Sequence, residues 1–291
     1  MMKKILVTGG NGQLGSELKE LSNDYSQFEF IFTDVEELDI TNEEAVDQAF
    51  AESSPNFVLN CAAYTAVDKA ESDLDLATKI NATAPKLLAE GSKKYGAKLI
   101  QISTDYVFDG TSHIPYTEEV STSPNSAYGD TKLDGEKYVE SIAEDYLIIR
   151  TSWLYSSFGN NFVKTMIRLG NEREELGIIF DQIGTPTYAA DLAQTIMEAV
   201  AKIDSGDVVD YRGVYHFSNE GVCSWYDFAK EIFRLENIEV RVKPIETLDY
   251  PTPANRPHYS VMNKKKIKQT FGVRIPHWAD SLKICLKKLR D

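Results

Sequence analysis

A glycine-rich segment near the start of the chain constrains the fold more than any other feature. The segment GGNGQLG, residues 9–15, follows the short strand expected at Lys3–Thr8 and precedes leucines at helical spacing. Glycines in such a turn let backbone N–H groups approach a pyrophosphate, and the helix N-terminus favours negative charge there. A second apolar strand, Phe28–Thr33, ends at Asp34 and completes a βαβ unit. This unit favours a dinucleotide site over a turn that only permits tight packing.

The same alternation of strands and helices continues to about residue 150. Beyond 9–34 the expected elements are a helix to about 51 with a capping box at Thr41 and Glu44, a strand at 57–59, a helix at 74–94, a strand at 98–103, a helix at 128–143 and a strand at 146–150. This order predicts an α/β fold, a Rossmann-type doubly wound parallel sheet with a smaller, interleaved C-terminal substrate-binding region.

The weaker periodicity after residue 155 suggests how the chain divides. We expect residues 1–155 to form an NAD(P)-binding Rossmann domain, with 180–205 returning to it. Residues 156–179 and 206–291 would then form the substrate-binding region.

Charge and composition exclude several classes of protein. The 31 basic and 45 acidic residues give a net charge of -14, which opposes binding to nucleic acid and to anionic membranes. No stretch approaches the roughly 18 apolar residues of a membrane span or resembles a signal-peptide core, so we expect a cytoplasmic protein. The three cysteines and four histidines lack disulfide or metal-ligand spacing, so we expect reduced thiols and no metal site.

Two Tyr-x-x-x-Lys pairs occur, and their surroundings separate them. Tyr226 and Lys230 lie in an amphipathic segment, where packing explains the spacing better. Tyr128 and Lys132 begin a helix and follow Thr104, which comes directly after a strand, where sites form in open α/β sheets. We expect the ammonium, the helix N-terminus and a nicotinamide to lower the tyrosine pKa from about 10 toward about 7. Tyr128 would then be the general acid for a carbonyl that is being reduced. Thr104 would hold the same carbonyl oxygen, and Lys132 would hold the nicotinamide ribose.

The acid that ends the second strand bears on the cofactor. Asp34 is placed to accept hydrogen bonds from the adenosine ribose, and its charge would repel a 2′-phosphate. This favours NAD(H), although basic residues elsewhere would accommodate NADP(H). The cofactor is therefore expected to be NADPH or NADH.

The glycine turn, Thr104 and the Tyr128/Lys132 pair together resemble the extended short-chain dehydrogenase/reductase family. Within that family the chain is similar to the dTDP-4-dehydrorhamnose reductases over nearly its whole length. The matching segments are NCAAYTAVDKAE at 60–71, STDYVFDG at 103–110, RTSWLY at 150–155, GNNFVKTM at 159–166, DQIGTPT at 181–187 and PTPANRP at 251–257.

This resemblance implies reduction of the C4 ketone of dTDP-4-dehydro-L-rhamnose by NAD(P)H, the last step of dTDP-rhamnose biosynthesis for polysaccharides. The implied catalytic residues are Thr104, Tyr128 and Lys132. The expected cofactor-binding residues are Gly9, Gly12, Gln13, Leu14, Gly15, Asp34, Asp39, Ile40, Ala62, Ala63, Tyr64, Thr65, Ser103, Tyr128 and Lys132. The dTDP-sugar would contact Thr104, Asp105 and Trp153, and Arg256 is the candidate for its diphosphate.

Two other functions stay open from the sequence. A sugar-nucleotide epimerase or dehydratase would retain its cofactor between half-reactions, and a non-catalytic NAD(P)-binding regulatory subunit, similar to the β subunit of methionine adenosyltransferase, would need no turnover. Family members that dimerise through magnesium use several glutamates, and only Glu17 has a counterpart here. We therefore expect no magnesium site, and a homodimer stays open.

Overall fold

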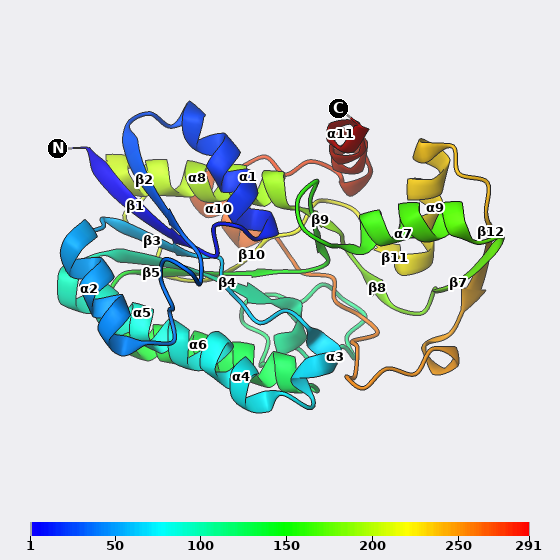
Figure 1. Cartoon of the computed structure of the whole chain (residues 1–291), viewed down its shortest axis with the longest axis horizontal. Helices are drawn as coiled ribbons and strands as arrows, with labels where there is room; N and C mark the ends of the chain where they lie inside the picture. Colours follow the sequence, from blue (N-terminus) through cyan, green and yellow to red (C-terminus); the bar gives the residue numbers. More distant parts are fainter. Residues whose placement is uncertain (1, 291) are drawn as a thin grey trace.

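A six-stranded parallel sheet is the framework of the protein (Figure 1). The computed structural model describes residues 2–290. The strand order is β10-β5-β4-β3-β1-β2, and every neighbouring pair is parallel. The strands are β1 (Lys3–Thr8), β2 (Phe28–Thr33), β3 (Phe57–Asn60), β4 (Lys98–Thr104), β5 (Tyr146–Thr151) and β10 (Gly213–His216). The order reverses beside β1, so a crevice forms at the carboxyl ends of β1 and β3. The predicted fold class is confirmed.

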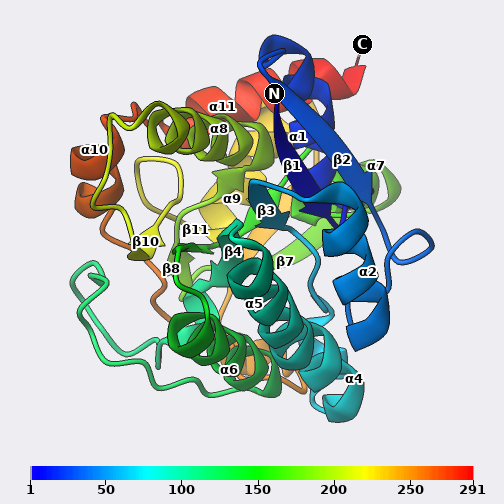
Figure 2. The same ribbon diagram turned by 90° about the vertical axis from the view of Figure 1, so that its left-hand side faces the viewer.

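Helices cover both faces of this sheet, which explains why its strands are apolar runs (Figure 2). On one face lie α2 (Glu43–Ser53), α5 (Ala84–Tyr95) and α6 (Ala127–Ile142). On the other lie α1 (Gln13–Leu21), α8 (Ala189–Ser205) and α10 (Lys265–Phe271). Ile5 and Val7 of β1 enter one core and Leu6 enters the other, as the alternation of a strand requires.

A smaller region extends beyond the carboxyl ends of the sheet, at the right of Figure 1. It contains α7 (Phe162–Glu172), α9 (Trp225–Glu236), α11 (Trp278–Arg290) and the parallel pair β7 (Glu175–Ile179) and β12 (Arg241–Ile245). Two short pairs accompany it: β6 (Leu154–Tyr155) with β9 (Thr187–Tyr188), which follow β5 and precede α8, and β8 (Ile183–Gly184) with β11 (Cys223–Ser224). Its aromatic core is separate from the two cores of the sheet.

The chain crosses between the two regions more often than the sequence indicates. We expected 206–291 to lie wholly in the substrate-binding region, but β10 pairs with β5 in the main sheet. Ile267 and Phe271 of α10 also pack in the core of the sheet domain. Four residues, Gly213–His216, are too short a strand to stand out in a segment without regular alternation.

Two local predictions need correction. Helix α2 is capped by Asn42, whose Oδ1 accepts a hydrogen bond from Ala45 N, and the predicted capping box at Thr41 and Glu44 is wrong. Thr41 donates instead to Asp39 Oδ1. The expected single helix at 74–94 is α4 (Leu74–Thr78), a π-helical turn (Lys79–Thr83) and α5. Pro85 has no N–H to continue an α-helical ladder through this point.

The π-helical turn carries a side chain that holds a loop near the crevice. Asn81 is buried; its Oδ1 accepts from Tyr64 N and its Nδ2 donates to Tyr64 O. The residues after β3 are thereby fixed by two hydrogen bonds. Within residues 2–290, no helix combines the length and the apolar character that crossing a bilayer requires.

A close approach between α6 and the π-helical turn generates a stability prediction. A Cβ on Gly135 would lie 2.1 Å from Asn81 O. Gly135→Ala should lower the free energy of unfolding by about 1 to 3 kcal/mol, despite the higher helix propensity of alanine, because backbone must move. Chemical denaturation measures the change. The exposed control on the same helix, Lys137→Ala, should stay within about 0.5 kcal/mol of the wild type. An equal effect of both substitutions would contradict the argument.

Candidate active site

A cavity of about 1090 Å³ opens at the carboxyl ends of the strands. The sheet domain contributes the glycine turn and the ends of β2 to β5, and the smaller region contributes Phe162 and Trp225. Most of the predicted site residues line it: Gly9, Gly12, Gln13, Leu14, Asp34, Asp39, Ile40, Ala62, Ala63, Thr65, Ser103, Thr104, Asp105, Tyr128, Lys132, Trp153 and Arg256.

Two predicted cofactor residues do not line the cavity. Gly15 lies behind the turn, where a Cβ would come within 2.3 Å of Gly9 O. Tyr64 is buried against Ala70 and Ala77, and its hydroxyl donates to Asp73 Oδ2. Both residues support the walls of the cavity, and a direct contact of either with the cofactor stays a prediction.

The glycine turn has the backbone geometry that an anion site requires. Gly9 has a φ of 67°, and a Cβ there would lie 2.7 Å from Ala62 N. Both the backbone conformation and this close contact therefore exclude a side chain at Gly9. The N-cap of α1, Gly12, offers no side chain to the first N–H groups, and the first turn holds no acidic residue. These N–H groups and the positive end of the helix dipole are therefore available to a pyrophosphate.

Asp34 is held at the rim of the cavity beside this turn. Its Oδ2 accepts from Asn11 N at 2.9 Å and its Oδ1 from Val35 N at 2.9 Å. The cavity-lining residues described by the structure include two bases, Lys132 and Arg256, and neither belongs to the turn or to β2. A 2′-phosphate at this rim would meet a carboxylate with no cation from the lining.

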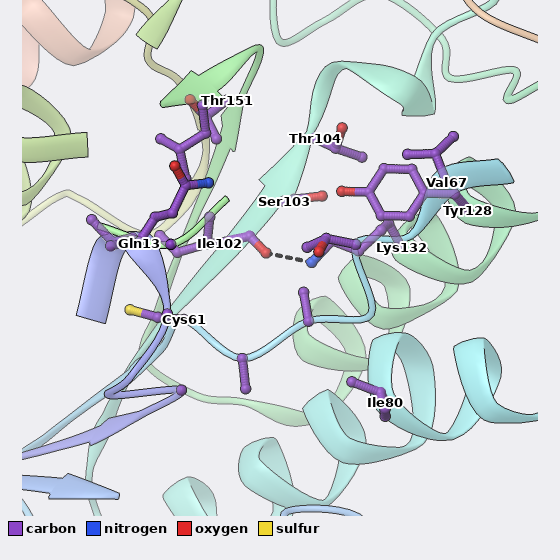
Figure 3. A pocket seen from close by; sticks show the side chains of 18 of the residues that line it. Gln13, Cys61, Val67, Ile80, Ile102, Ser103, Thr104, Tyr128, Lys132 and Thr151 are labelled. Atoms are coloured by element: carbon purple, nitrogen blue, oxygen red, sulfur yellow. Dashed lines mark hydrogen bonds between the residues drawn. The ribbon is translucent and has the colours of Figure 1, made fainter. Parts of the chain in front are cut away.

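The three predicted catalytic residues come together on the opposite wall (Figure 3). The Tyr128 hydroxyl points toward Ser103 and Thr104, and Lys132 lies beneath it. Lys132 is 4 % exposed, and its Nζ donates to Ile102 O at 2.7 Å. Thr104 Oγ1 donates to Asp105 Oδ1 at 3.0 Å.

Local sequence explains why Tyr128 stands here. Ser126 caps α6 by accepting a hydrogen bond from Gly129 N, so Tyr128 lies in the first turn of the helix. A Cβ on Gly129 would lie 2.3 Å from Tyr106 O, so this glycine lets the helix start close to the end of β4. The Tyr106 ring then meets the Tyr128 ring edge-on, with centroids 5.4 Å apart.

Burial sets the protonation states of this wall. Burial raises the pKa of Tyr128 to about 12; the Thr104 hydrogen bond opposes this and the Asp105 carboxylate adds to it. Burial lowers the pKa of Lys132 to about 8, while the Glu136 carboxylate acts in the other direction. In the protein without cofactor, removal from water therefore keeps the pKa of Tyr128 above its ordinary value. Our expectation of a pKa near 7 includes a bound nicotinamide and stays a prediction. A neutral phenol is the form that donates a proton to a carbonyl oxygen.

Asp105 is a buried carboxyl at the same wall. Burial raises its pKa to about 7, against the hydrogen bond that the Thr104 hydroxyl donates to it. Its Oδ2 and the neighbouring Ser103 Oγ are buried atoms without a hydrogen-bond partner among residues 2–290. Buried polar atoms normally have partners, so this wall is arranged for a polar ligand.

A buried ion pair behind the wall was missed by the sequence analysis. Glu136 and Arg150 are 2 % and 4 % exposed, and Arg150 Nη2 donates to Glu136 Oε2 at 2.6 Å. The pair joins α6 to the end of β5, beside Lys132. An arginine in an otherwise apolar strand and a glutamate one turn after Lys132 were the available signals.

The remaining predicted residues lie at the outer part of the cavity. Arg256 Nη2 donates to Asp68 Oδ2 at 2.6 Å, so the loop 251–257 is tied to α3 (Val67–Ala70). Trp153 stacks on Trp225, with ring centroids 3.6 Å apart. Neither Asp68 nor Trp225 was predicted as part of the site.

Glu17, the residue discussed above for magnesium, is buried and has two partners within the chain. Ser156 Oγ donates to its Oε1 at 2.6 Å, and Lys288 Nζ donates to its Oε2 at 2.8 Å. Among residues 2–290, no three His, Cys, Asp or Glu side chains are grouped so as to hold a metal ion.

Comparison with known proteins decides the family. The model of the family described as "RmlD substrate binding domain" matches residues 2–291. The chain is 41% identical to a dTDP-4-dehydrorhamnose reductase from Aggregatibacter actinomycetemcomitans, over 97% of this chain and 98% of the relative. This chain belongs to the dTDP-4-dehydrorhamnose reductase family. A reductase of that name from Escherichia coli K12 is 40% identical, over 98% and 97% of the two chains.

Solved structures agree with this family. A dTDP-4-dehydrorhamnose reductase from Clostridium acetobutylicum has a TM-score of 0.93 at 49% identity, with coverage of 99% of this chain and 100% of that one. The Bacillus anthracis reductase, solved in complex with NADP, has a TM-score of 0.93 at 42% identity and the same coverage. A Thermus thermophilus UDP-glucose 4-epimerase, at 19% identity, shares the fold. The predicted family is confirmed, and the roles of individual residues stay predictions.

The rim at Asp34 predicts a cofactor preference within this reductase family. Asp34→Asn should raise kcat/KM for NADPH relative to NADH about tenfold or more, because like charges about 4 Å apart repel by about 1 to 4 kcal/mol. Initial rates with each dinucleotide measure the ratio. Glu36→Gln removes the same charge from an exposed neighbour that does not line the cavity, and should leave the ratio unchanged. A preference for NADPH in the unaltered protein would contradict this account.

Asp105 predicts a pH dependence. Below about pH 7 its carboxyl is neutral; above that pH its negative charge opposes the negative charge that develops on the substrate oxygen. Turnover should therefore fall as the pH rises through about 7, and Asp105→Asn should remove this limb. A second limb near pH 8, from loss of the Lys132 proton, should remain. An unchanged fall near pH 7 in the asparagine variant would assign that limb to another group.

Proposed function

We propose that this protein reduces the C4 ketone of dTDP-4-dehydro-L-rhamnose to dTDP-L-rhamnose with NADPH or NADH, the last step of dTDP-rhamnose biosynthesis. The observation that carries the proposal is the presence of Tyr128, Thr104 and Lys132 on one wall of a cavity whose other wall is the uncapped glycine turn. The names of the relatives supply the sugar nucleotide.

Different residues of the chain bind the dinucleotide and the sugar nucleotide. The N–H groups of the glycine turn hold the dinucleotide pyrophosphate, and Asp34 accepts from the adenosine ribose. The Lys132 ammonium, fixed by Ile102 O, faces the nicotinamide ribose. Trp153 and Asp105 contact the sugar, and Arg256 faces the diphosphate.

Tyr128 is the proton donor. The bound dinucleotide supplies the hydride to the ketone carbon. The Tyr128 hydroxyl donates its proton to the ketone oxygen as that oxygen becomes an alkoxide, a stronger base than a phenolate. Thr104 orients the same oxygen. The pKa of about 12 keeps the proton on Tyr128 until the alkoxide forms, and the adjacent ammonium stabilises the phenolate that is left.

Removal of the Tyr128 hydroxyl is the direct test. Tyr128→Phe should lower kcat by about 10² to 10⁴, the usual contribution of a general acid, with little change in dinucleotide affinity. NADPH absorbance with the keto sugar nucleotide measures turnover, and calorimetry measures binding. The matched control is Tyr226→Phe, which removes the hydroxyl from the second Tyr-x-x-x-Lys pair on α9.

The same assay separates the alternatives. Turnover that survives Tyr128→Phe would remove the mechanism. Cofactor that stays bound through purification, without net NADPH consumption, would indicate an epimerase or dehydratase. Absence of any turnover would favour the regulatory subunit.

The proposal extends to the cellular setting and the assembly of the protein. We place the reaction in the cytoplasm, where sugar nucleotides are made, and we leave a homodimer as the assembly to test. Light scattering of the purified chain distinguishes a dimer from a monomer.

A further inference from the structure

The backbone at Trp153 is unusual for the place it occupies. Among residues 2–290, three non-glycine residues have positive φ: Ser54, Trp153 and Asn237. Ser54 and Asn237 end helices α2 and α9, where a left-handed residue is ordinary. Trp153, with a φ of 48°, ends no helix and lies in the cavity wall between β5 and β6. A bulky residue in this conformation is strained and persists only where its surroundings hold it.

Contacts from three directions hold Trp153. Its carbonyl oxygen accepts from Thr187 N at 3.2 Å. Its indole lies parallel to that of Trp225, at 3.6 Å between centroids and 11° between planes. Gly184 lies against the indole so closely that a Cβ there would come within 2.7 Å of two ring atoms.

Trp225 and Gly184 belong to one unit. Gly184 of β8 pairs with Cys223 of β11, two residues before Trp225. A capping box formed by Ser224 and Asp227 fixes the start of α9, and with it the backbone of Trp225. The Phe162 ring also packs on Trp225, with centroids 4.6 Å apart. The smaller region therefore fixes the position of the Trp153 indole through Trp225 and Gly184.

The Trp153 indole lies beside the cavity wall that carries Thr104 and Tyr128. Trp153 follows Thr151, whose Cα is the register partner of Thr104. Ser260 Oγ lies 2.6 Å from the Cβ position of Gly184 and, like Asp105 Oδ2, is a buried atom without a hydrogen-bond partner among residues 2–290. The flat indole thus adjoins polar groups that suit the hydroxyls and ketone of a sugar, and it offers an apolar surface to the C–H face of the ring.

We propose that Trp225 is a positioning residue that holds Trp153 against the sugar, so that the sugar end of the cavity is set by the smaller region. This inference rests on the proposed function, since it takes the substrate to be a sugar nucleotide. Trp225 acts through Trp153 and leaves dinucleotide binding to the glycine turn.

The test uses the three tryptophans of the chain, Trp153, Trp225 and Trp278. Trp225→Leu removes the stack, Trp225→Phe keeps an aromatic face, and Trp278→Phe is the control outside the cavity. Trp225→Leu should raise KM for the keto sugar nucleotide about tenfold or more, as a displaced positioning group does, with a smaller effect on kcat. NADH affinity should stay within about twofold. Trp225→Phe should recover most of the loss, and Trp278→Phe should change neither constant.

Circular dichroism supplies a readout independent of turnover. Two parallel indoles in contact couple their transitions and give a band pair of opposite sign, which Trp225→Leu should abolish and Trp278→Phe should keep. In the unaltered protein, a dTDP-sugar should change this signal and NADH alone should not. That measurement needs no disruptive variant, so it decides the proposal even where Trp225→Leu fails to fold.

Several outcomes would overturn the proposal. An unchanged KM with the coupled band abolished would show that the stack does not position the sugar. An equal loss of sugar and NADH affinity would show a general structural role. Absence of turnover in the unaltered protein would instead refute the proposed function; calorimetry with a dTDP-sugar on the same variants would then still decide the role of Trp225.

Discussion

Removal of charged and ionisable groups from water controls the chemistry of this cavity. Tyr128, Lys132 and Asp105 are each pushed toward the neutral form by burial, and each shift has burial as its largest cause. At neutral pH the Tyr128 phenol therefore keeps its proton, the Asp105 carboxyl is about half protonated, and the Lys132 ammonium beside them is more easily lost than usual. This is the protonation pattern of a site that donates a proton to a reacting oxygen. The buried Glu136–Arg150 pair keeps the same wall rigid from behind without adding net charge.

Parallel pairing explains how residues from distant segments reach this wall. All six strands present their carboxyl ends at the same edge, so the turn after β1, Asp34 after β2, Thr104 at the end of β4 and Trp153 after β5 open on one cavity. The smaller region closes the far side by short pairs such as β8 with β11. Residues of both regions thereby line one cavity, in which we propose that the cofactor and the sugar bind.

The sequence predicts the parts of this site that depend on local spacing. The glycine turn, Asp34, Thr104 and Tyr128 are recognisable because a strand, a turn or a helix start fixes each within a few residues. Asn81, the Glu136–Arg150 pair, Asp68 and Trp225 escaped prediction because their partners are distant in sequence or become adjacent only in the folded chain. The raised pKa of Tyr128 in the protein without cofactor escaped prediction for the same reason, since the depth of burial is a property of the fold. Strand β10 was missed because four residues carry too little periodicity.

The late position of β10 in the chain bears on how the protein is made. Its neighbour β5 ends at Thr151, but β10 begins at Gly213, after the whole of α7, β7 and α8. During translation β5 is left as an open sheet edge until His216 has left the ribosome, and an unpaired edge invites pairing with other chains. The other five strands of the main sheet have been synthesised by then, so the pairing of β10 with β5 closes this edge last.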